Sequence, residues 1–386
     1  MPVITKKNDT TKKDPVEHDK SIKIELNKNI SVLFSEDDDP KIREQFINVL
    51  EMGIFNKKLK SIKLEIITFT DILDLEKILD TKDNQGKIYI GPISDKFSKL
   101  PNKYCDKGAI FFSFSSNVNF ANKCIYLINF FPKNELEQLF SYLDDSSKVA
   151  LLFPENKYGY MINSLIDDIA NNSNAIIVNR ASYKNDLSNV RDAIIELGRY
   201  ELRKYELDRQ KIILSNKNDS ESIKRLKKLQ KFQTTNDYDF THILIADYGL
   251  NLLRVAPLLP YYDIDPKIVQ FMGTGVIDDD NFFSEPSLQG AIFPGIEKEK
   301  RADLINNYES VYDESLIRIS TLPYDLLGLL SYVFENNMSL SMFKNLLNNS
   351  NIKFEGIDGN FYFNENMIER QLKILKISNG KASNIN

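Results

Sequence analysis

The chain contains few of the residues on which common catalytic sites depend. Its 386 residues include two histidines, two cysteines and no tryptophan. His18 and His242 are too few for a multi-histidine zinc site, and they leave a histidine-based triad one plausible base at most. The sequence also has no G-x-x-x-x-G-K-[ST] phosphate loop and no G-x-S-x-G nucleophile elbow. We therefore expect a protein that is not an enzyme and that uses no cofactor.

Long apolar runs and an excess of positive charge are also absent. The longest apolar runs, such as "VALLFP" and "HILIADYG", have the length of strands and fall short of the roughly 20 residues that span a bilayer. The formal net charge is −5 and the pI is about 5.4, so no overall field attracts nucleic acid or anionic lipid. We expect no nucleic-acid partner and no transmembrane segment.

The two cysteines and the first residues bear on where the protein is located. Cys105 and Cys124 lie too far apart in sequence for a C-x-x-C motif. We expect two buried free thiols, with a single disulfide as the alternative if the chain is exported. Residues 1–27 are rich in Lys, Asp and Thr, and they contain neither the apolar segment of a signal peptide nor a lipobox cysteine. We expect a disordered lead there and no export signal in the sequence as it stands.

The rest of the chain alternates between short apolar runs and amphipathic stretches. Runs of strand length include "ISVLF", "KLEIITF" and "KIYIGP", and later "KVALLFP", "AIIVNRASY" and "THILIADYG". Stretches with helical periodicity, such as "PKIREQFINVLEMGIF", lie between them. This alternation predicts the α/β class, with two successive parallel sheets that carry helices on both faces.

Residues 194–232 exceed a minimal α/β unit and predict a helical hairpin. Two charged helical stretches flank the polar turn "SNKNDS". We expect a solvated amphipathic insertion, with an arm that docks onto a partner as the alternative that the local excess of Lys and Arg in an acidic chain supports. The candidate partner-binding residues are Arg199, Arg203, Lys204, Arg225 and Lys228.

The stretch "VQFMGTGVIDDD" at 269–280 combines two glycines with three aspartates, and it is a candidate for a phosphate site or a metal site. The aspartates that follow Gly-Thr-Gly after Val276 and Ile277 would repel a pyrophosphate, and the spaced ligands of a calcium loop are missing. We expect residues 278–280 to form an acidic loop that caps the next helix and binds no metal. Asp39 before Pro40 is likewise a helix cap by pattern.

Small polar residues and tyrosines follow several predicted strands. In parallel α/β sheets, ligands bind outside the carboxyl ends of the strands, so these positions are candidates for holding a small polar ligand. Ordinary turn and cap roles are the alternative for the same residues. The candidates are Ser94, Ser115, Ser116, Asn117, Tyr158, Asp247, Tyr248 and Thr274.

Several segments, in this order and spacing, resemble one known family. They are "KIYIGPISDKF", "AIFFSFSSN", "VALLFPENKYGY", "APLLPYYDIDP" followed by "GTG", "EPSLQGAIFPG", "PYDLLGLL" and "FEGIDGNFYFNENM". This pattern, over residues 28–377, is similar to the penicillin-binding protein activators of the LpoA type from Gram-negative bacteria. Those proteins share the type I periplasmic binding-protein fold with leucine/isoleucine/valine-binding proteins. The resemblance adds Tyr324 to the ligand candidates.

The resemblance implies two Rossmann-like lobes joined by three crossovers. It places lobe 1 at 28–132 and 292–348 and lobe 2 at 133–291 and 349–380, followed by a tail at 381–386. The crossovers would lie near 131–133, 291–295 and 349–354. The family also implies a periplasmic or outer-membrane location, commonly through a lipid anchor, and a non-enzymatic role in stimulating a peptidoglycan synthase.

The sequence departs from the amino-acid-binding relatives at two positions. Where those relatives place a carboxylate to pair with the ligand's ammonium group, this chain has Thr274, so that charge-assisted contact is missing. At the end of the first strand it has "FSEDDDP" in place of a glycine-containing loop, which disfavours an anionic ligand. The expected function is therefore regulation of a peptidoglycan synthase. The alternative is a substrate-binding protein of an importer for amino acids or similar small polar solutes.

Overall fold

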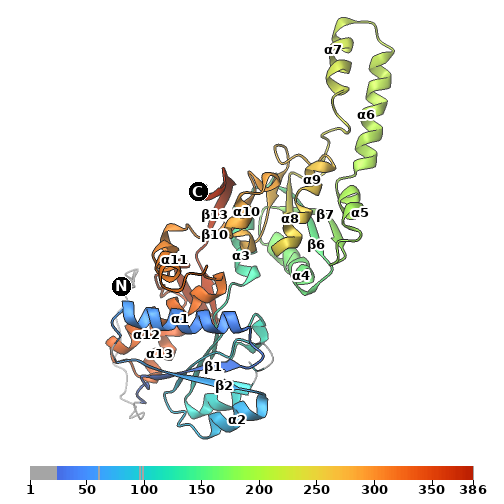
Figure 1. The fold of residues 1–386 in the computed structure, drawn as a ribbon. Coiled ribbons are helices and arrows are strands. Elements are labelled where there is room, and N and C mark those ends of the chain that lie inside the picture. The colour runs from blue at the N-terminus through green and yellow to red at the C-terminus, as the bar shows by residue number, and fades with distance from the viewer. Residues whose placement is uncertain (1–23, 60, 95–96, 98–99, 386) are drawn as a thin grey trace, which may run out of the picture. The chain divides into compact units, whose positions relative to one another are not determined.

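The chain folds into two α/β lobes, each built on its own sheet. The structure is a computed structural model, and it describes residues 24–59, 61–94, 97 and 100–385. Lobe 1 comprises the described residues up to Phe131 and the segment Lys298–Gln371; lobe 2 comprises Pro132–Glu297 and the described residues from Leu372 (Figure 1). The predicted pair of largely parallel sheets with flanking helices is confirmed. Within the described ranges, no helix is long and apolar enough to cross a membrane.

Lobe 1 has a seven-stranded sheet in the order β11-β12-β5-β4-β3-β1-β2. Its strands are β1 (Asn29–Ser35), β2 (Lys63–Phe69), β3 (Ile88–Ile90), β4 (Ile110–Ser113), β5 (Ile125–Leu127), β11 (Phe361–Asn364) and β12 (Met367–Arg370). Its main helices are α1 (Pro40–Asn56), α2 (Ile72–Asp80), α11 (Glu299–Tyr312), α12 (Leu322–Glu335) and α13 (Leu340–Leu347). Asp39 caps α1 as predicted, because its carboxylate accepts from the N–H groups of Lys41 and Ile42.

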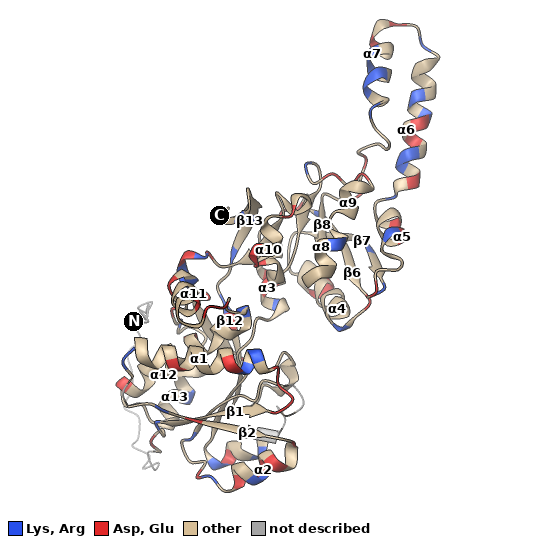
Figure 2. Cartoon of the chain, in the orientation of Figure 1, with Lys and Arg blue, Asp and Glu red and all other residues tan. Residues whose placement is uncertain are grey.

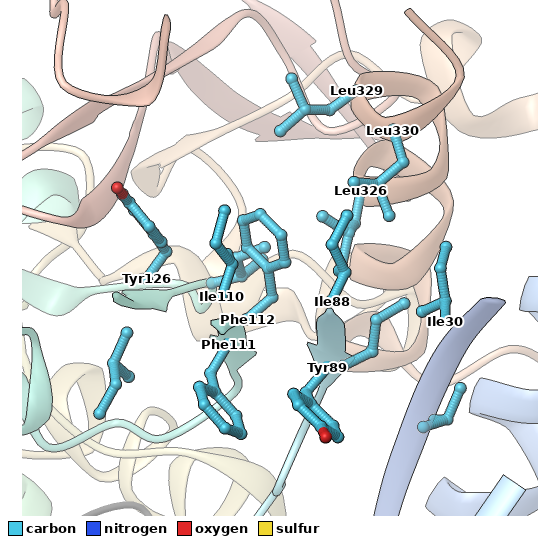
Figure 3. Close-up of a cluster of buried hydrophobic side chains, with 14 of the residues drawn as sticks. Ile30, Ile88, Tyr89, Ile110, Phe111, Phe112, Tyr126, Leu326, Leu329 and Leu330 are labelled. Atoms are coloured by element: carbon cyan, nitrogen blue, oxygen red, sulfur yellow. The ribbon is translucent and has the colours of Figure 1, made fainter. Parts of the chain in front are cut away.

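Both faces of the lobe 1 sheet are buried. Figure 3 shows that Tyr89 and Phe111 point to one side of their strands, while Ile88 and Phe112 point to the other, towards Leu326 of α12. All four strand residues have no exposed surface. The strands are therefore apolar at consecutive positions, since a parallel sheet covered by helices has no solvated face.

The two cysteines form a disulfide in lobe 1, so the expectation of free thiols is wrong. Their Cα atoms lie 5.2 Å apart. Cys105 lies in the 3₁₀ helix η2 (Leu100–Lys107), and Cys124 directly precedes β5. Strand β4 runs between them, and the returning chain brings Cys124 back to η2. That return is a tertiary event, which the spacing of the two cysteines could not show.

Lobe 2 has a seven-stranded sheet in the order β14-β13-β10-β9-β8-β6-β7. Its strands are β6 (Lys148–Pro154), β7 (Ile176–Tyr183), β8 (His242–Ile245), β9 (Gln270–Met272), β10 (Ile292–Gly295), β13 (Lys373–Ser378) and β14 (Lys381–Asn384). Its helices include α3 (Pro132–Ser141), α4 (Lys157–Asn171), α5 (Val190–Leu197), α8 (Gly249–Val255), α9 (Leu258–Tyr261) and α10 (Asp280–Phe283). Strands β6 to β10 are parallel to their neighbours in this group, and β13 returns antiparallel to β10.

The chain passes between the lobes after Phe131, after Glu297 and after Gln371. The third passage differs from the expected 349–354. Residues 361–370 form the hairpin β11–β12, which joins the lobe 1 sheet because Met367 pairs with Leu127 of β5. The second passage follows β10, which belongs to the lobe 2 sheet and occupies the expected crossover at 291–295.

Both ends of the described chain are more ordered than the sequence suggested. The expected tail at 381–386 contains β14, which pairs with β13. Most of the expected lead at 1–27 lies outside the described residues, but its last part packs on lobe 1. There the N–H of Asn27 donates to the carbonyl of Gly86 at 2.9 Å, and Leu26 is buried.

The helical hairpin predicted at 194–232 is confirmed in lobe 2, except that residues 194–197 belong to the preceding helix α5. Helices α6 (Tyr200–Ser215) and α7 (Ser220–Leu229) pack side by side and extend away from the lobe 2 sheet (Figure 1). Leu207 and Leu214 of α6 are buried along the hairpin. We call residues 199–232 the arm.

Candidate functional site

Four of the ligand candidates gather at the carboxyl edge of the lobe 2 sheet. Tyr158 lies in the first turn of α4 after β6, Asp247 and Tyr248 follow β8, and Thr274 follows β9. Strands β6, β8 and β9 are adjacent and parallel, so their carboxyl ends lie side by side. The sequence prediction that these residues follow strands is thus correct, and we call Tyr158, Asp247, Tyr248 and Thr274 the lobe 2 cluster.

The tyrosines of the lobe 2 cluster form an aromatic wall. The ring centroids of Tyr158 and Tyr248 are 5.2 Å apart with an interplanar angle of 85°, an edge-to-face contact. The Tyr158 hydroxyl lies 2.5 Å from the Thr274 hydroxyl, and Thr274 is fully buried. Tyr248 is 49% exposed, so its side chain offers an apolar surface to solvent at this edge.

Asp247 is a buried carboxylate with two donors. It accepts from the Tyr183 hydroxyl at 2.5 Å and from the N–H of Tyr248 at 2.8 Å. Burial raises the pKa of Asp247, and the two hydrogen bonds oppose this rise by stabilising the charged form. Burial and the neighbouring Asp247 also raise the pKa of Tyr183. The sequence analysis missed Tyr183, although it ends β7 and the rule of polar residues at strand ends could have found it.

A second buried carboxylate, that of Glu135 in α3, contacts the turn after β9. Oε2 of Glu135 accepts from the N–H of Gly275 at 2.9 Å, and Glu135 is buried. Gly275 begins the 3₁₀ helix η4 (Gly275–Ile277), where an exposed N–H would attract an anion. Here the carboxylate of Glu135, from the same lobe, accepts from this N–H in place of an external anion. No sequence signal pointed to it, because 140 residues separate the two partners.

The glycine and aspartates around Thr274 have structural roles. A Cβ atom on Gly273 would lie 1.9 Å from Cδ1 of Ile277, so a side chain at this turn would require Ile277 to move. Asp279 caps α10 by accepting from the N–H of Asn281 at 2.9 Å, as predicted. Over the described ranges, no group of three or more His, Cys, Asp or Glu side chains could hold a metal ion.

The lobe 1 candidates at strand ends take part in turns and caps. The N–H of Ser115 donates to Oγ of Ser113 at 3.3 Å, and the N–H of Asn117 donates to Oγ of Ser115 at 3.0 Å. The Asn117 side chain caps the short helix η3 (Val118–Phe120). Ser94 follows β3, is half-buried and lies at the same edge of the sheet, and Ser116 is exposed. This set therefore presents few free polar groups.

Tyr324 lies away from these strand ends. It is in the first turn of α12 beside Gly53 of α1, and Nζ of Lys57 lies 4.5 Å from its ring centroid. Tyr324 and Lys57 line a cavity of about 360 Å³ in lobe 1, to which Ser94 and residues 115–117 do not contribute.

The arm displays basic and apolar side chains. Lys and Arg outnumber Asp and Glu in residues 199–232, and Figure 2 shows several basic positions along α6 and α7. Lys204, Arg225 and Lys228 are exposed, and Arg199 forms a partly exposed ion pair with Asp239 at 2.5 Å. The exposed apolar residues of the arm include Leu202, Tyr205, Ile212, Ile213, Ile223 and Phe232.

Arg203 does not belong to this exposed surface, so its inclusion among the partner-binding residues is corrected. It is 2% exposed at the base of the arm. Its guanidinium donates to the carbonyls of Gly198, Thr235, Tyr262 and Asp263 and to the Thr234 hydroxyl, at 2.7–3.2 Å. The side chain therefore ties α6 to the returning chain and to the end of α9. The sequence shows a charged residue on a charged helix, and only the tertiary contacts show that this position is enclosed.

Known proteins are similar to this chain in structure and not in sequence. No family model and no curated protein matches the sequence. Among solved structures, a putative branched-chain amino acid ABC transporter protein from Rhodospirillum rubrum is similar, with a TM-score of 0.69, 11% identity, and coverage of 92% of this chain and 99% of that one. The chain has the type I periplasmic binding-protein fold. At such low identity the likeness extends to the fold alone.

Two further similar structures are those of a substrate-binding protein and of LpoA. The substrate-binding protein LivJ of Streptococcus pneumoniae, solved with isoleucine, has a TM-score of 0.56 at 12% identity, covering 92% of this chain and 98% of that one. LpoA of Haemophilus influenzae has a TM-score of 0.60 at 12% identity, covering 94% of this chain and 59% of that one. Other similar structures are named as substrate-binding or solute-binding proteins of ABC transporters or as an extracellular ligand-binding receptor.

Proposed function

We propose that this protein is a non-catalytic binding protein of the cell envelope that regulates a peptidoglycan synthase by docking onto it. The observation that carries the proposal is the arm, an insertion in lobe 2 that exposes basic side chains beside Tyr205, Ile212 and Ile213. Surface apolar residues grouped with basic ones fit a protein partner with an acidic rim around an apolar centre. The arm is anchored at its base by Arg203, so it presents these side chains on an ordered support.

The lobe 2 cluster supports a role that does not depend on a small ligand. The buried hydroxyl of Thr274, the carboxylate of Asp247 and the N–H of the neighbouring Gly275 are engaged within the lobe by Tyr158, Tyr183 and Glu135, respectively. A receptor commonly leaves such groups available to the ligand it encloses. The resemblance of the sequence to synthase activators agrees with this reasoning and supplies the class of partner.

An envelope location is part of the proposal. The disulfide Cys105–Cys124 supports it, because disulfides persist in oxidising compartments such as the periplasm and are rare in the cytosol. Attachment through a lipid anchor belongs to the same proposal.

The test uses a purified bifunctional penicillin-binding protein and measures its rate of glycan polymerisation. Saturating wild-type protein should raise this rate, and the double variant Arg225→Glu with Lys228→Glu should bind the synthase roughly tenfold more weakly. A matched control reverses two exposed lysines of lobe 2 outside the arm, Lys267→Glu with Lys376→Glu, and should behave as wild type. An unchanged rate at saturation would contradict the proposal.

A second candidate, a substrate-binding protein for amino acids or similar solutes, is favoured by one observation. Tyr248 is half-exposed beside Tyr158 at the carboxyl edge of the lobe 2 sheet, where ligands of such folds are held. A thermal-shift screen against amino acids distinguishes the two functions, because a ligand at 100 times its Kd stabilises by about 2.7 kcal/mol. A flat response across the panel would rule against the solute receptor.

A further inference from the structure

Lobe 1 contains a cavity that the proposed function does not use. Its volume is about 360 Å³, at the lower end of the range for small-molecule sites. The walls come from the end of α1, the start of α12, residues 355–357 and Lys300 of α11. All of these segments belong to lobe 1, so the cavity is complete within one lobe.

Lys57 brings a partly buried ammonium group to this cavity. The residue caps the C-terminus of α1, and its Nζ lies 4.5 Å from the ring centroid of Tyr324. Among the residues that the structure describes, no carboxylate forms an ion pair with it. Burial lowers the pKa of Lys57, and the charge of Asp325 opposes that shift. The positive charge of Lys57, where it faces the cavity, therefore lacks enough nearby negative charge to offset its partial burial.

The carboxylate of Asp325 lies in the cavity wall, but its charge is already compensated. It accepts from Nη1 of Arg370 at 2.7 Å and from the N–H of Ile357 at 2.7 Å, and all three groups lie within lobe 1. Lys300 and Glu355 are exposed and carry opposite charges. Lys57 is thus the partly buried cavity-lining charge that a ligand could neutralise.

Gly328 keeps the cavity open. It lies inside α12, where glycine costs about 1 kcal/mol relative to alanine. A Cβ atom there would have one neighbour within 4 Å, Nζ of Lys57 at 3.7 Å. A larger side chain at 328 would therefore project into the space beside the ammonium group.

We propose that this cavity binds a small anion, a carboxylate or a phosphate, whose negative group pairs with Lys57 against the ring of Tyr324. The pairing is a charge-assisted hydrogen bond in a partly dehydrated site, where such a bond is strongest. The proposal does not depend on docking to a synthase, and neither result decides the other.

The test measures binding of sodium succinate and of inorganic phosphate to the full chain by calorimetry and thermal shift, with sodium chloride at matched ionic strength as the reference. We expect saturable binding of at least one of the two anions. Lys57→Met should weaken that binding about tenfold or more, since a hydrogen bond to a charged group contributes about 1.5–3 kcal/mol. Gly328→Leu should block it while leaving every charge in place.

Matched controls separate the site from general effects of salt and of folding. Gly328→Ala and Lys77→Met, the latter an exposed lysine of α2, should bind as wild type does. Lys57→Met should unfold at the same or a higher temperature without ligand, because it removes a poorly compensated charge. Binding of succinate alone identifies a carboxylate site, and binding of phosphate alone identifies a phosphate site. Absence of saturable binding, or equal binding by Lys57→Met, would overturn the proposal.

Discussion

The hydroxyl of Tyr158 lies 2.5 Å from that of Thr274, although 116 residues separate the two in the chain. This hydrogen bond joins the first turn of α4 to the turn after β9. Thr274 is the position at which the sequence lacks the carboxylate of amino-acid receptors, and in the structure its hydroxyl is satisfied within lobe 2. The bond therefore gives Thr274 a structural role at the sheet edge.

Tyr158→Phe should lower the free energy of unfolding by about 1–2 kcal/mol, because it leaves the buried Thr274 hydroxyl without this partner. Combining it with Thr274→Val should cost less than the sum of the two single changes, by about 1 kcal/mol. Urea denaturation of the four proteins measures this coupling. Tyr160→Phe, at a neighbouring exposed tyrosine, is the control and should stay within about 0.5 kcal/mol of wild type. Strict additivity would contradict the assigned hydrogen bond.

Asp247 should make lobe 2 less stable as the pH rises. Burial raises its pKa in the folded state above the ordinary value of 3.8, so the folded protein binds more protons than the unfolded chain between these two pKa values. The stability contribution of this group is therefore greatest at low pH and falls as the pH rises through that window. Asp247→Asn should remove this part of the pH dependence, measured as Tm from pH 3.5 to about 7. The exposed Asp237→Asn should leave the profile unchanged, and an identical profile for Asp247→Asn would contradict the prediction.

Arg203→Met should loosen the arm at its base. The change leaves the carbonyls of Thr235 and Tyr262, among others, without their donor, and each unsatisfied buried group costs about 1–3 kcal/mol. We expect a loss of about 3 kcal/mol or more in the stability of this region, seen as faster amide hydrogen exchange in α6 and α7. Arg225→Met, on the exposed side of α7, should leave exchange unchanged. Equal exchange in both variants would show that Arg203 does not anchor the arm.

The disulfide should contribute measurably to lobe 1. Closing a loop between Cys105 and Cys124, which are 19 residues apart, is expected to stabilise by about 3 kcal/mol. The double variant Cys105→Ala with Cys124→Ala should lose about this much in urea denaturation. Reductant should destabilise the wild type by a similar amount and leave the double variant unaffected. A wild type that is insensitive to reductant under unfolding conditions would argue against the bond.

Local sequence patterns predicted those features that nearest neighbours along the chain determine. Asp39 caps α1 and Asp279 caps α10 because a carboxylate two or three residues before a free N–H can reach it in either case. The alternation of strands and helices and the two helices of the arm follow from periodicity, which is also local. The polar residues of the lobe 2 cluster could be placed at strand ends for the same reason.

For features that join distant segments of the chain, the sequence predictions were wrong or missing. Residues 361–370 have an ordinary strand pattern, and nothing in that pattern says which lobe they join; the pairing of Met367 with Leu127 decides it. Tyr183 donates to Asp247 of the lobe 2 cluster, and Glu135 accepts from the neighbouring Gly275, each from another element of the fold. The pairing of the two cysteines depends on how the chain returns after β4.

By itself the sequence determined the α/β class, the helical arm and the scarcity of catalytic residues, because composition and periodicity act over a few neighbouring positions. The tertiary structure alone decided that Arg203 is an anchor enclosed by carbonyls, that Lys57 faces a cavity with no carboxylate partner in the described part of the chain, and that Thr274 already has a hydroxyl partner. The physical reason is that burial and electrostatic compensation depend on which distant groups are brought within a few ångströms, and the order of residues along the chain does not specify that.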